Sequence, residues 1–105
     1  MRRGAVWWAE MGRPMGRRPV VLLSRGAAYR ARNQVTVAPL TTRVRGIRSE
    51  VGLGPQDGLP RPCVANLDNI NTIRVGQLLE RVSQLGADKI RSIEDAIHYA
   101  LGLAH

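Results

Sequence analysis

A chain of 105 residues has room for one domain with a modest core, so we expect a single domain over residues 1–105. Its formal net charge of +8 is unevenly placed: residues 1–52 carry a net +9, with eleven Arg against Glu10 and Glu50, and residues 53–105 carry a net −1. This asymmetry indicates a polyanionic partner, and Arg in place of Lys favours bidentate contact with phosphate. A GC-rich genome would explain the choice of Arg but not its uneven distribution.

The few cysteines and histidines exclude several kinds of site. Cys63 is the only cysteine, which rules out an intramolecular disulfide, and the two histidines, His98 and His105, lack the Cys/His spacing of a zinc site. No segment is long and apolar enough to span a membrane. We therefore expect a cytoplasmic protein that binds no metal and needs no cofactor.

Strands and turns alternate through the first part of the chain. Val6–Ala9 is rich in residues that favour strands, and Gly12–Gly16 has the composition of a tight turn. Pro19–Leu23 is a continuously apolar run, which predicts a strand buried on both faces. Arg17 and Arg18 stand immediately before this run, so we expect them at the mouth of the strand.

A basic loop follows the next predicted strand. Residues 26–32 are consistent with one or two helical turns, and Gln34–Ala38 has strand composition that we expect to end at Pro39 and the Thr41-Thr42 pair. Residues 42–49 then form a loop in which three Arg surround a glycine, at positions 43, 45 and 48.

The second half begins with strands and ends with a helix. Short strands are predicted at Glu50–Leu53, Cys63–Ala65, Ile70–Ile73 and Leu79–Val82, separated by turn regions at 54–62 and 66–69. From Ala87 to Leu101, apolar residues recur at three- and four-residue steps (Ile90, Ile93, Ile97, Leu101), which predicts an amphipathic helix stopped by Gly102. Short strands with a short and a terminal helix predict a compact α+β domain, most simply a barrel-like sheet with helices packed outside.

The basic half supplies phosphate-binding groups but little acid–base chemistry. It has no paired carboxylates, no His and no phosphate-binding glycine loop; its functional groups are those of Arg17, Arg18, Thr41, Thr42, Arg43, Arg45 and Arg48. Such groups bind phosphate oxygens and stabilise transition-state charge. They suit cleavage of RNA, whose ribose 2′-OH is a built-in nucleophile. From composition alone, a surface that only binds nucleic acid remains the simpler interpretation.

Three further residues have competing interpretations. On a regular strand Trp7 and Trp8 point to opposite sides, and we prefer a role in the core and in a dimer contact over stacking on a base. Cys63, within an apolar triplet, is expected to be a buried small hydrophobic residue.

Four stretches, in order, match those of a known family. They are Arg2–Trp7 (RRGAVW), Gly16–Leu22 (GRRPVVL), Val37–Thr42 (VAPLTT) and Asn69–Ile73 (NINTI). With them the sequence resembles the MazF/PemK family of RNA interferases over nearly its whole length. The residue that precedes the proline of the second stretch, Arg18, matches the family's catalytic Arg, and the first Thr of the third stretch, Thr41, matches its catalytic Thr.

By this resemblance Arg18 contacts the scissile phosphate and assists proton transfer, and Thr41 holds the phosphate for in-line attack. Arg17 and Thr42 are the neighbouring alternatives, and with Arg43, Arg45 and Arg48 they are candidates for binding the RNA backbone. The resemblance also implies a small SH3-like β-barrel of the PemK/CcdB type, a homodimer, and an acidic cognate antitoxin similar to MazE.

The implied function is a sequence-specific endoribonuclease toxin of a type II toxin–antitoxin system. It would cut single-stranded RNA by 2′-OH attack without a metal, leaving 2′,3′-cyclic phosphate and 5′-OH ends. Two alternatives stay open: a CcdB-like toxin that binds gyrase without nuclease activity, and a basic RNA-binding module. The loop before Arg17 is short and lacks the family's Gly-Ser-Glu-Gln stretch, and Ala5 replaces an acidic residue. The family's recognition sequence therefore does not transfer, and mRNA, tRNA and rRNA all stay open as targets.

Overall fold

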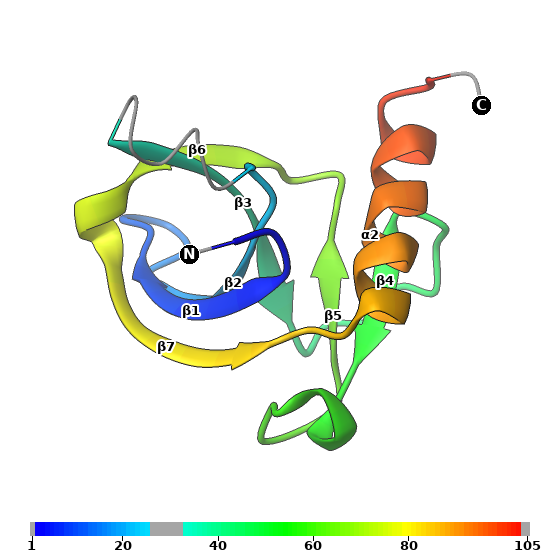
Figure 1. Ribbon diagram of the computed structural model, residues 1–105, viewed down its shortest axis with the longest axis horizontal. Coiled ribbons are helices and arrows are strands. Elements are labelled where there is room, and N and C mark those ends of the chain that lie inside the picture. Colours follow the sequence, from blue (N-terminus) through cyan, green and yellow to red (C-terminus); the bar gives the residue numbers. More distant parts are fainter. Residues whose placement is uncertain (1, 26–32, 104–105) are drawn as a thin grey trace.

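The computed structural model describes residues 2–25 and 33–103, and within them the chain is an α+β fold (Figure 1). The strands are β1 (Ala5–Glu10), β2 (Arg17–Leu22), β3 (Gln34–Thr41), β4 (Glu50–Leu53), β5 (Cys63–Asn66), β6 (Asn71–Arg74) and β7 (Leu78–Gln84). Two short 3-10 helices, η1 (Pro55–Asp57) and η2 (Val75–Gln77), and the α-helix α2 (Ala87–Ala100) complete it. The short helix expected within residues 26–32 lies outside the described residues.

The strands form one antiparallel sheet around the long strand β3. The strand order is β4-β5-β3-β2-β1-β7, and β6 pairs with β3 beside this path. Residues 37–39 of β3 pair with β2 along one edge; along the other, residues 34–37 pair with β6 and residues 40–41 with β5. The predicted α+β class and barrel-like sheet are confirmed, with one difference: among the described strands, β4 and β7 end the path and do not pair, so the barrel is open.

Each face of the sheet has its own hydrophobic cluster. One contains Val6, Val21 and Leu40 together with Ile93 and Ala96 of α2, and the other contains Val20, Leu22 and Val37. Successive residues of β2 and β3 thus enter opposite clusters, as the alternation of side chains along a strand requires. The expectation that the apolar run of β2 is buried on both faces is confirmed.

The helix α2 covers one of these clusters and packs beside β4 (Figure 1). Ile93 and Ala96 are buried in it, and Ile90 and Ile97 are partly buried, in agreement with the predicted apolar stripe. Leu101, the last expected member of the stripe, is instead 60% exposed and lies one residue past the end of the helix at Ala100. No helix in the described part of the chain is long and apolar enough to cross a membrane.

Two strands extend further than their composition suggests. β2 begins at Arg17, because Arg17 and Arg18 pair with Glu10 and Ala9 and so lengthen the hairpin with β1. β3 continues through a proline to Thr41. Pro39 lies between the segment that pairs with β6 and the segment that pairs with β5, and a proline fits there because that edge needs no N–H donor.

Candidate functional site

The strand order brings the beginning of β2 beside the end of β3. Because these strands are antiparallel neighbours, Arg18, the second residue of β2, and Thr41, the last residue of β3, reach the same edge of the sheet. Both line a hollow of about 320 Å³, which we call the groove. Its other walls come from Met15, Pro39, Arg43, Arg45, Glu50, Asn66 and Asn69.

Arg18 and Arg17 differ in where they point. The Nε–H of Arg18, which is half-buried, donates to the carbonyl oxygen of Met15 at 3.3 Å, so the terminal nitrogens of the guanidinium remain to bind an anion. The exposed Arg17 points to the other side of the strand, where its Nε lies 3.0 Å from the Glu10 carboxylate. The structure therefore brings Arg18 into the groove and leaves Arg17 outside it.

Thr41 occupies the turn from β3 into the basic loop. Its Oγ1 accepts the backbone N–H of Arg43 at 3.1 Å, which fixes the hydroxyl and leaves its own proton to donate. Thr42, the next residue, lines a different hollow, and Thr41 lines both. Thr41 is thus the member of the pair that shares the groove with Arg18.

The basic loop is folded back by one carboxylate. Glu50, the first residue of β4, accepts the backbone N–H of Arg45 at 3.0 Å and that of Gly46 at 2.9 Å. Gly46 has a φ of 73°, a conformation that glycine adopts at little cost. Hydrogen bonds to an ionised carboxylate are strong, and these place Arg43 and Arg45 at the groove.

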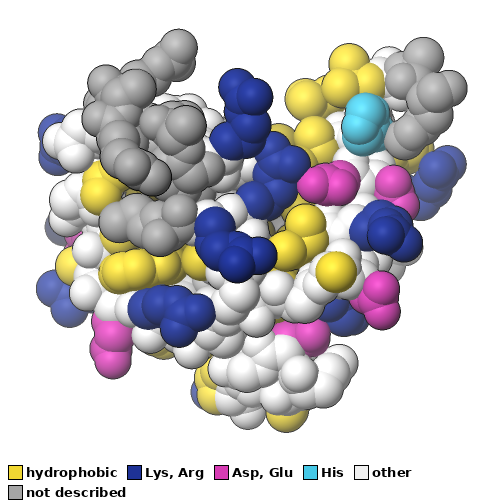
Figure 2. Space-filling view, viewed as in Figure 1, with side chains coloured by type: hydrophobic (Ala, Val, Ile, Leu, Met, Phe, Trp, Pro, Cys, Tyr) yellow, Lys and Arg dark blue, Asp and Glu magenta, His cyan; other side chains and the backbone are white. Residues whose placement is uncertain are grey.

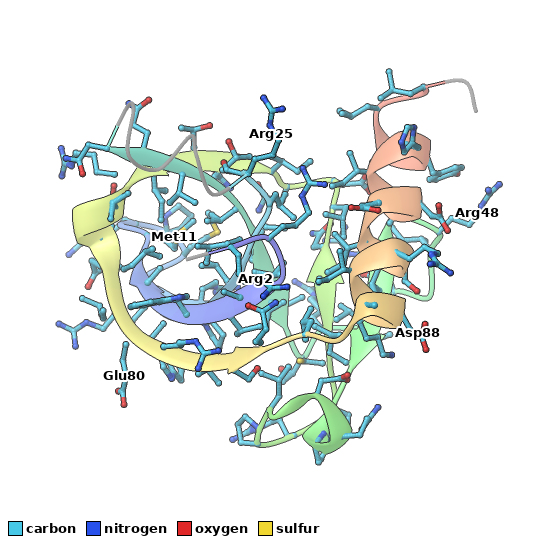
Figure 3. All side chains as sticks on the ribbon, in the orientation of Figure 1. Arg2, Met11, Arg25, Arg48, Glu80 and Asp88 are labelled. Carbon is cyan, nitrogen blue, oxygen red and sulfur yellow. The ribbon has the colours of Figure 1, made fainter. Side chains whose placement is uncertain are left out.

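Arg48 does not line the groove and contacts the helix α2 instead. Its guanidinium carbon lies 4.3 Å from the centroid of the Tyr99 ring of α2, a cation–π contact. Figure 3 shows Arg48 on the far side of α2 from β1 and β2. It lines a separate hollow of about 340 Å³ with Lys89 and Asp95. Of the seven candidate residues, the structure brings Arg18, Thr41, Arg43 and Arg45 together and places Arg17, Thr42 and Arg48 elsewhere.

Other basic side chains of the first half, among them Arg2, Arg3 and Arg25, do not line the groove. Figure 2 shows Lys and Arg side chains beside α2, and Figure 3 labels Arg2 and Arg25 in the same view. Arg3 is engaged structurally, because it donates to the carbonyl oxygen of Leu23 at 2.8 Å and to the Glu94 carboxylate at 2.9 Å. Only part of the positive charge of the first half therefore lies at the groove.

Five lining residues of the groove were not among the site candidates from the sequence: Met15, Pro39, Glu50, Asn66 and Asn69. Asn66 is the last residue of β5 and Asn69 lies in the turn that follows it. Asn69 reaches across to Met15, with 3.8 Å between Nδ2 and Sδ. Glu50 was noted only as one of two carboxylates in the basic half. The signal for the amides was their place at a turn, where side chains that both donate and accept hydrogen bonds can meet a polar ligand.

The second hollow, of about 240 Å³, is mostly apolar. Trp8, Pro19, Leu40, Leu59, Pro60 and Cys63 line it, with Thr41, Thr42 and Arg61 as its polar members. Trp8 is 40% exposed there, whereas Trp7 packs against the hydrophobic cluster that contains Val20. The expectation that the two indoles face opposite sides is confirmed.

Cys63 is less buried than its sequence context predicts. It packs against the core but is only partly buried, because it begins β5 at the mouth of the apolar hollow. Burial raises the pKa of the Cys63 thiol, and the negative charge of Asp57 raises it further. Among the residues that the structure describes, no group of three or more His, Cys, Asp and Glu side chains is placed to hold a metal ion.

Known proteins are similar to this chain in sequence and in fold. The family model of the PemK-like, MazF-like toxins of type II toxin–antitoxin systems matches residues 2–101. The probable endoribonuclease MazF5 of Mycobacterium tuberculosis is 44% identical over 100 residues, which cover 94% of this chain and 91% of the relative.

Two solved structures are similar throughout. The Mycobacterium tuberculosis toxin MazF-mt6 has a TM-score of 0.88 and 34% identity, over 96% of this chain and 99% of that one. An endoribonuclease in complex with its cognate antitoxin, from a mycobacterial species, has a TM-score of 0.89 and 30% identity, over 100% of this chain and 98% of that one. The match of the family model, the identity to MazF5 and the shared fold agree: this chain belongs to the PemK-like, MazF-like toxin family of type II toxin–antitoxin systems.

Proposed function

We propose that this chain is the endoribonuclease toxin of a type II toxin–antitoxin pair and that it cuts single-stranded RNA at a short sequence. The observation that carries the proposal is the groove, in which the guanidinium of Arg18 and the hydroxyl of Thr41 lie with Arg43 and Arg45. These groups bind and neutralise a phosphodiester. The related MazF5 is named a probable endoribonuclease, which supports the same activity.

The reaction we propose is an attack by the substrate on itself. The 2′-oxygen of the ribose forms a bond to phosphorus and loses its proton, while the bond from phosphorus to the 5′-oxygen breaks and that oxygen gains a proton. Arg18 and Thr41 hold the phosphate in line for this attack and neutralise its developing charge. The products are a 2′,3′-cyclic phosphate and a 5′-OH.

The two alternative functions make different demands on the groove. A CcdB-like toxin that binds gyrase is not favoured, because the relatives matched here are named endoribonucleases. A module that only binds RNA would need the arginines but not a hydroxyl set beside them at the end of β3. The groove includes the hydroxyl of Thr41, which favours cleavage.

Cleavage of RNA by the purified protein, with and without EDTA, tests this function. We expect cutting in EDTA, because the basic half offers only Glu10 and Glu50 as carboxylates for a two-metal site. A single 2′-deoxyribose immediately 5′ of the scissile phosphate should leave binding intact and stop cleavage. Full activity on that substrate, or activity that EDTA abolishes and magnesium restores, would falsify the mechanism.

The proposal includes an acidic antitoxin as a partner. The solved endoribonuclease in complex with its cognate antitoxin supports an antitoxin partner, and the basic groove favours an acidic one. A flexible acidic tail would repeat the charge pattern of the RNA backbone, so it should occupy the same basic groove. We expect this binding to weaken as salt is added and to exclude RNA. Simultaneous binding of RNA and antitoxin would contradict a shared groove.

The proposal also includes a homodimer in the cytoplasm. A small sheet domain of this size gains buried surface by two-fold pairing, which is the commonest form of oligomer. The RNA substrate and the lone free Cys63 suit a reducing compartment.

A further inference from the structure

The apolar hollow and the groove meet at one residue. Pro39 lines the groove and Leu40 lines the apolar hollow, as expected for successive residues of a strand, and Thr41 lines both. The two spaces therefore lie on opposite sides of the end of β3. A ligand that touches Thr41 from the groove can continue over the end of the strand into the apolar hollow.

The walls of the apolar hollow have the chemistry of a site for a flat aromatic ring. The indole of Trp8 is 40% exposed at the hollow, and Leu40 and Cys63 add apolar surface. Polar groups at Thr42 and Arg61 complete the lining. A nucleobase has an aromatic face, which stacks on such side chains, and a polar edge, which needs hydrogen-bond partners.

We propose that this hollow binds one unpaired base of the RNA, next to the scissile phosphate, with the indole of Trp8 as its stacking surface. The inference rests on the proposed function and adds a specificity-determining residue to it. When the scissile phosphate lies at Arg18 and Thr41, the base of the adjacent nucleotide reaches over the end of β3 into the apolar hollow. In this position the base no longer stacks on the other bases of the RNA. Only an unpaired nucleotide can do this, so the hollow selects single-stranded RNA.

Two variants of Trp8 and one control test the contact by cleavage kinetics. Trp8→Ala should lower kcat/KM by about 5- to 150-fold, the usual range for loss of one stacked base, and Trp8→Phe should restore most of it. Leu79→Ala is the matched control, because Leu79 is an exposed apolar residue of β7 that lines neither hollow. Thermal melting of each variant shows whether the fold is kept.

Substrates with a missing base identify the ligand. An abasic nucleotide at one position beside the scissile phosphate should cost the wild-type enzyme as much as Trp8→Ala does. The same abasic substrate should cost Trp8→Ala nothing more, because the contact is already lost. Independent, additive losses would overturn the proposal.

The single thiol gives a readout that does not depend on cleavage. Cys63 lines the hollow, so an RNA that carries the blocking 2′-deoxyribose should slow its alkylation in the wild type. The labelling is best done at alkaline pH, because the raised pKa of Cys63 keeps the thiol protonated near neutrality. The same oligonucleotide without the base at that position should protect Cys63 much less.

The outcomes separate this inference from the proposed function. If the wild-type protein cuts no RNA, both the proposed function and the base site are refuted. If the wild-type protein cuts RNA, Trp8→Ala is equally active and RNA does not protect Cys63, only the base site is refuted. Trp8→Ala that cuts normally but loses its antitoxin or its dimer assigns the hollow to a protein partner and also overturns the base site.

Discussion

Neighbouring residues with the same side chain have different environments at the start of β2. Arg18 lies in the groove with Thr41, whereas Arg17 pairs with Glu10 on the outside of the strand. The alternation of side chains along a strand causes this difference, since one residue of shift moves a side chain to the other face. The two arginines therefore form a matched experimental pair.

We predict that Arg18→Ala lowers the rate of RNA cleavage by about 100- to 1,000-fold, as loss of a transition-state donor does. Arg18→Lys should recover only part of this, because lysine keeps the charge but lacks the planar fork of donors. Arg17→Ala should cut at close to the wild-type rate, and melting curves of all three should stay near that of the wild type. Loss of cleavage in Arg17→Ala with normal cutting by Arg18→Ala would reverse the assignment.

Local sequence patterns predicted some of these residues and not others. Local patterns placed the Arg17-Arg18 pair before an apolar run and the Thr41-Thr42 pair at the end of a strand, and the family resemblance then selected Arg18 and Thr41 from these pairs. The carboxylate of Glu50, which folds the loop back, and the ring of Tyr99, which holds Arg48, are contacts between elements. Patterns within a single stretch carry no information on such pairings.

At the scale of elements, the basic loop divides its arginines between two surfaces. Arg43 and Arg45 line the groove, and Arg48 stacks on Tyr99 at the side of α2. Only the first two are placed to neutralise RNA phosphates, although all three have the same charge. Salt dependence of binding distinguishes these roles, because each phosphate contact releases bound counterions.

We predict that Arg43→Ala and Arg45→Ala each reduce the slope of log affinity against log salt by about 0.7, the value for one contact with a single strand. Arg48→Ala should leave the slope unchanged. Fluorescence anisotropy with the uncleavable 2′-deoxy oligonucleotide, over a series of salt concentrations, measures all three. Equal changes of slope for the three variants would place Arg48 on the RNA.

A glycine joins three elements near the N-terminus. The Gly4 N–H donates to the carbonyl oxygen of Leu22 at the end of β2, and its own carbonyl accepts the N–H of Leu85 just after β7. Its φ is 91°, and a Cβ added there would lie 2.7 Å from side-chain atoms of Ile90 in α2. The position therefore requires the conformational freedom of glycine and its lack of a side chain.

We predict that Gly4→Ala lowers the free energy of unfolding by about 1–3 kcal/mol, from backbone strain and overpacking together. Gly76→Ala is the control, because Gly76 lies in η2 without positive φ and with no atom within 4 Å of an added Cβ. Urea unfolding of both variants gives the comparison. A Gly4→Ala protein as stable as Gly76→Ala would contradict this account.

At the scale of the molecule, one end of α2 keeps apolar side chains in solvent. Tyr99 is 49% and Leu101 60% exposed, and Ile47 and Val44 of the basic loop are exposed as well. The loop and the helix end are held together by the contact of Arg48 with Tyr99. Hydrophobic side chains gather at this end of α2 in Figure 2. Grouped apolar exposure marks a surface that a second copy can cover.

We predict a homodimer in solution that Leu101→Asp weakens at least about tenfold, because a charge would be buried in the interface without a partner. Light scattering over a concentration series measures this. Leu79→Asp, on β7, is the control and should dimerise normally. A wild-type monomer that cleaves RNA at micromolar concentration would refute the dimer, and a dimer broken only by Leu79→Asp would move its interface to β7.

Much of the architecture was predictable because its signals are local. The three- and four-residue spacing of Ile90, Ile93 and Ile97 predicted α2, and the apolar run of β2 predicted its two buried faces. The apolar hollow was not predictable, because Trp8, Leu40 and Cys63 meet there only after three separate strands have paired. The exposure of Leu101 was likewise not predictable, because it depends on what packs against the end of α2 and not on the helical pattern.

The first strand pairs with the last of the described strands, with Ala5 opposite Gln84 and Ala9 opposite Leu78. The N-terminus of a nascent polypeptide emerges from the ribosome first, so β1 emerges long before β7. Until β7 has emerged, one edge of β1 stays unpaired. The pairing of β2 with β3, which sets Arg18 beside Thr41, can form earlier from nearer parts of the chain. Contacts so distant in sequence form slowly. The sheet that carries the groove is therefore completed only after translation has passed Gln84, so that its first edge stays open while nearly all of the described chain is made.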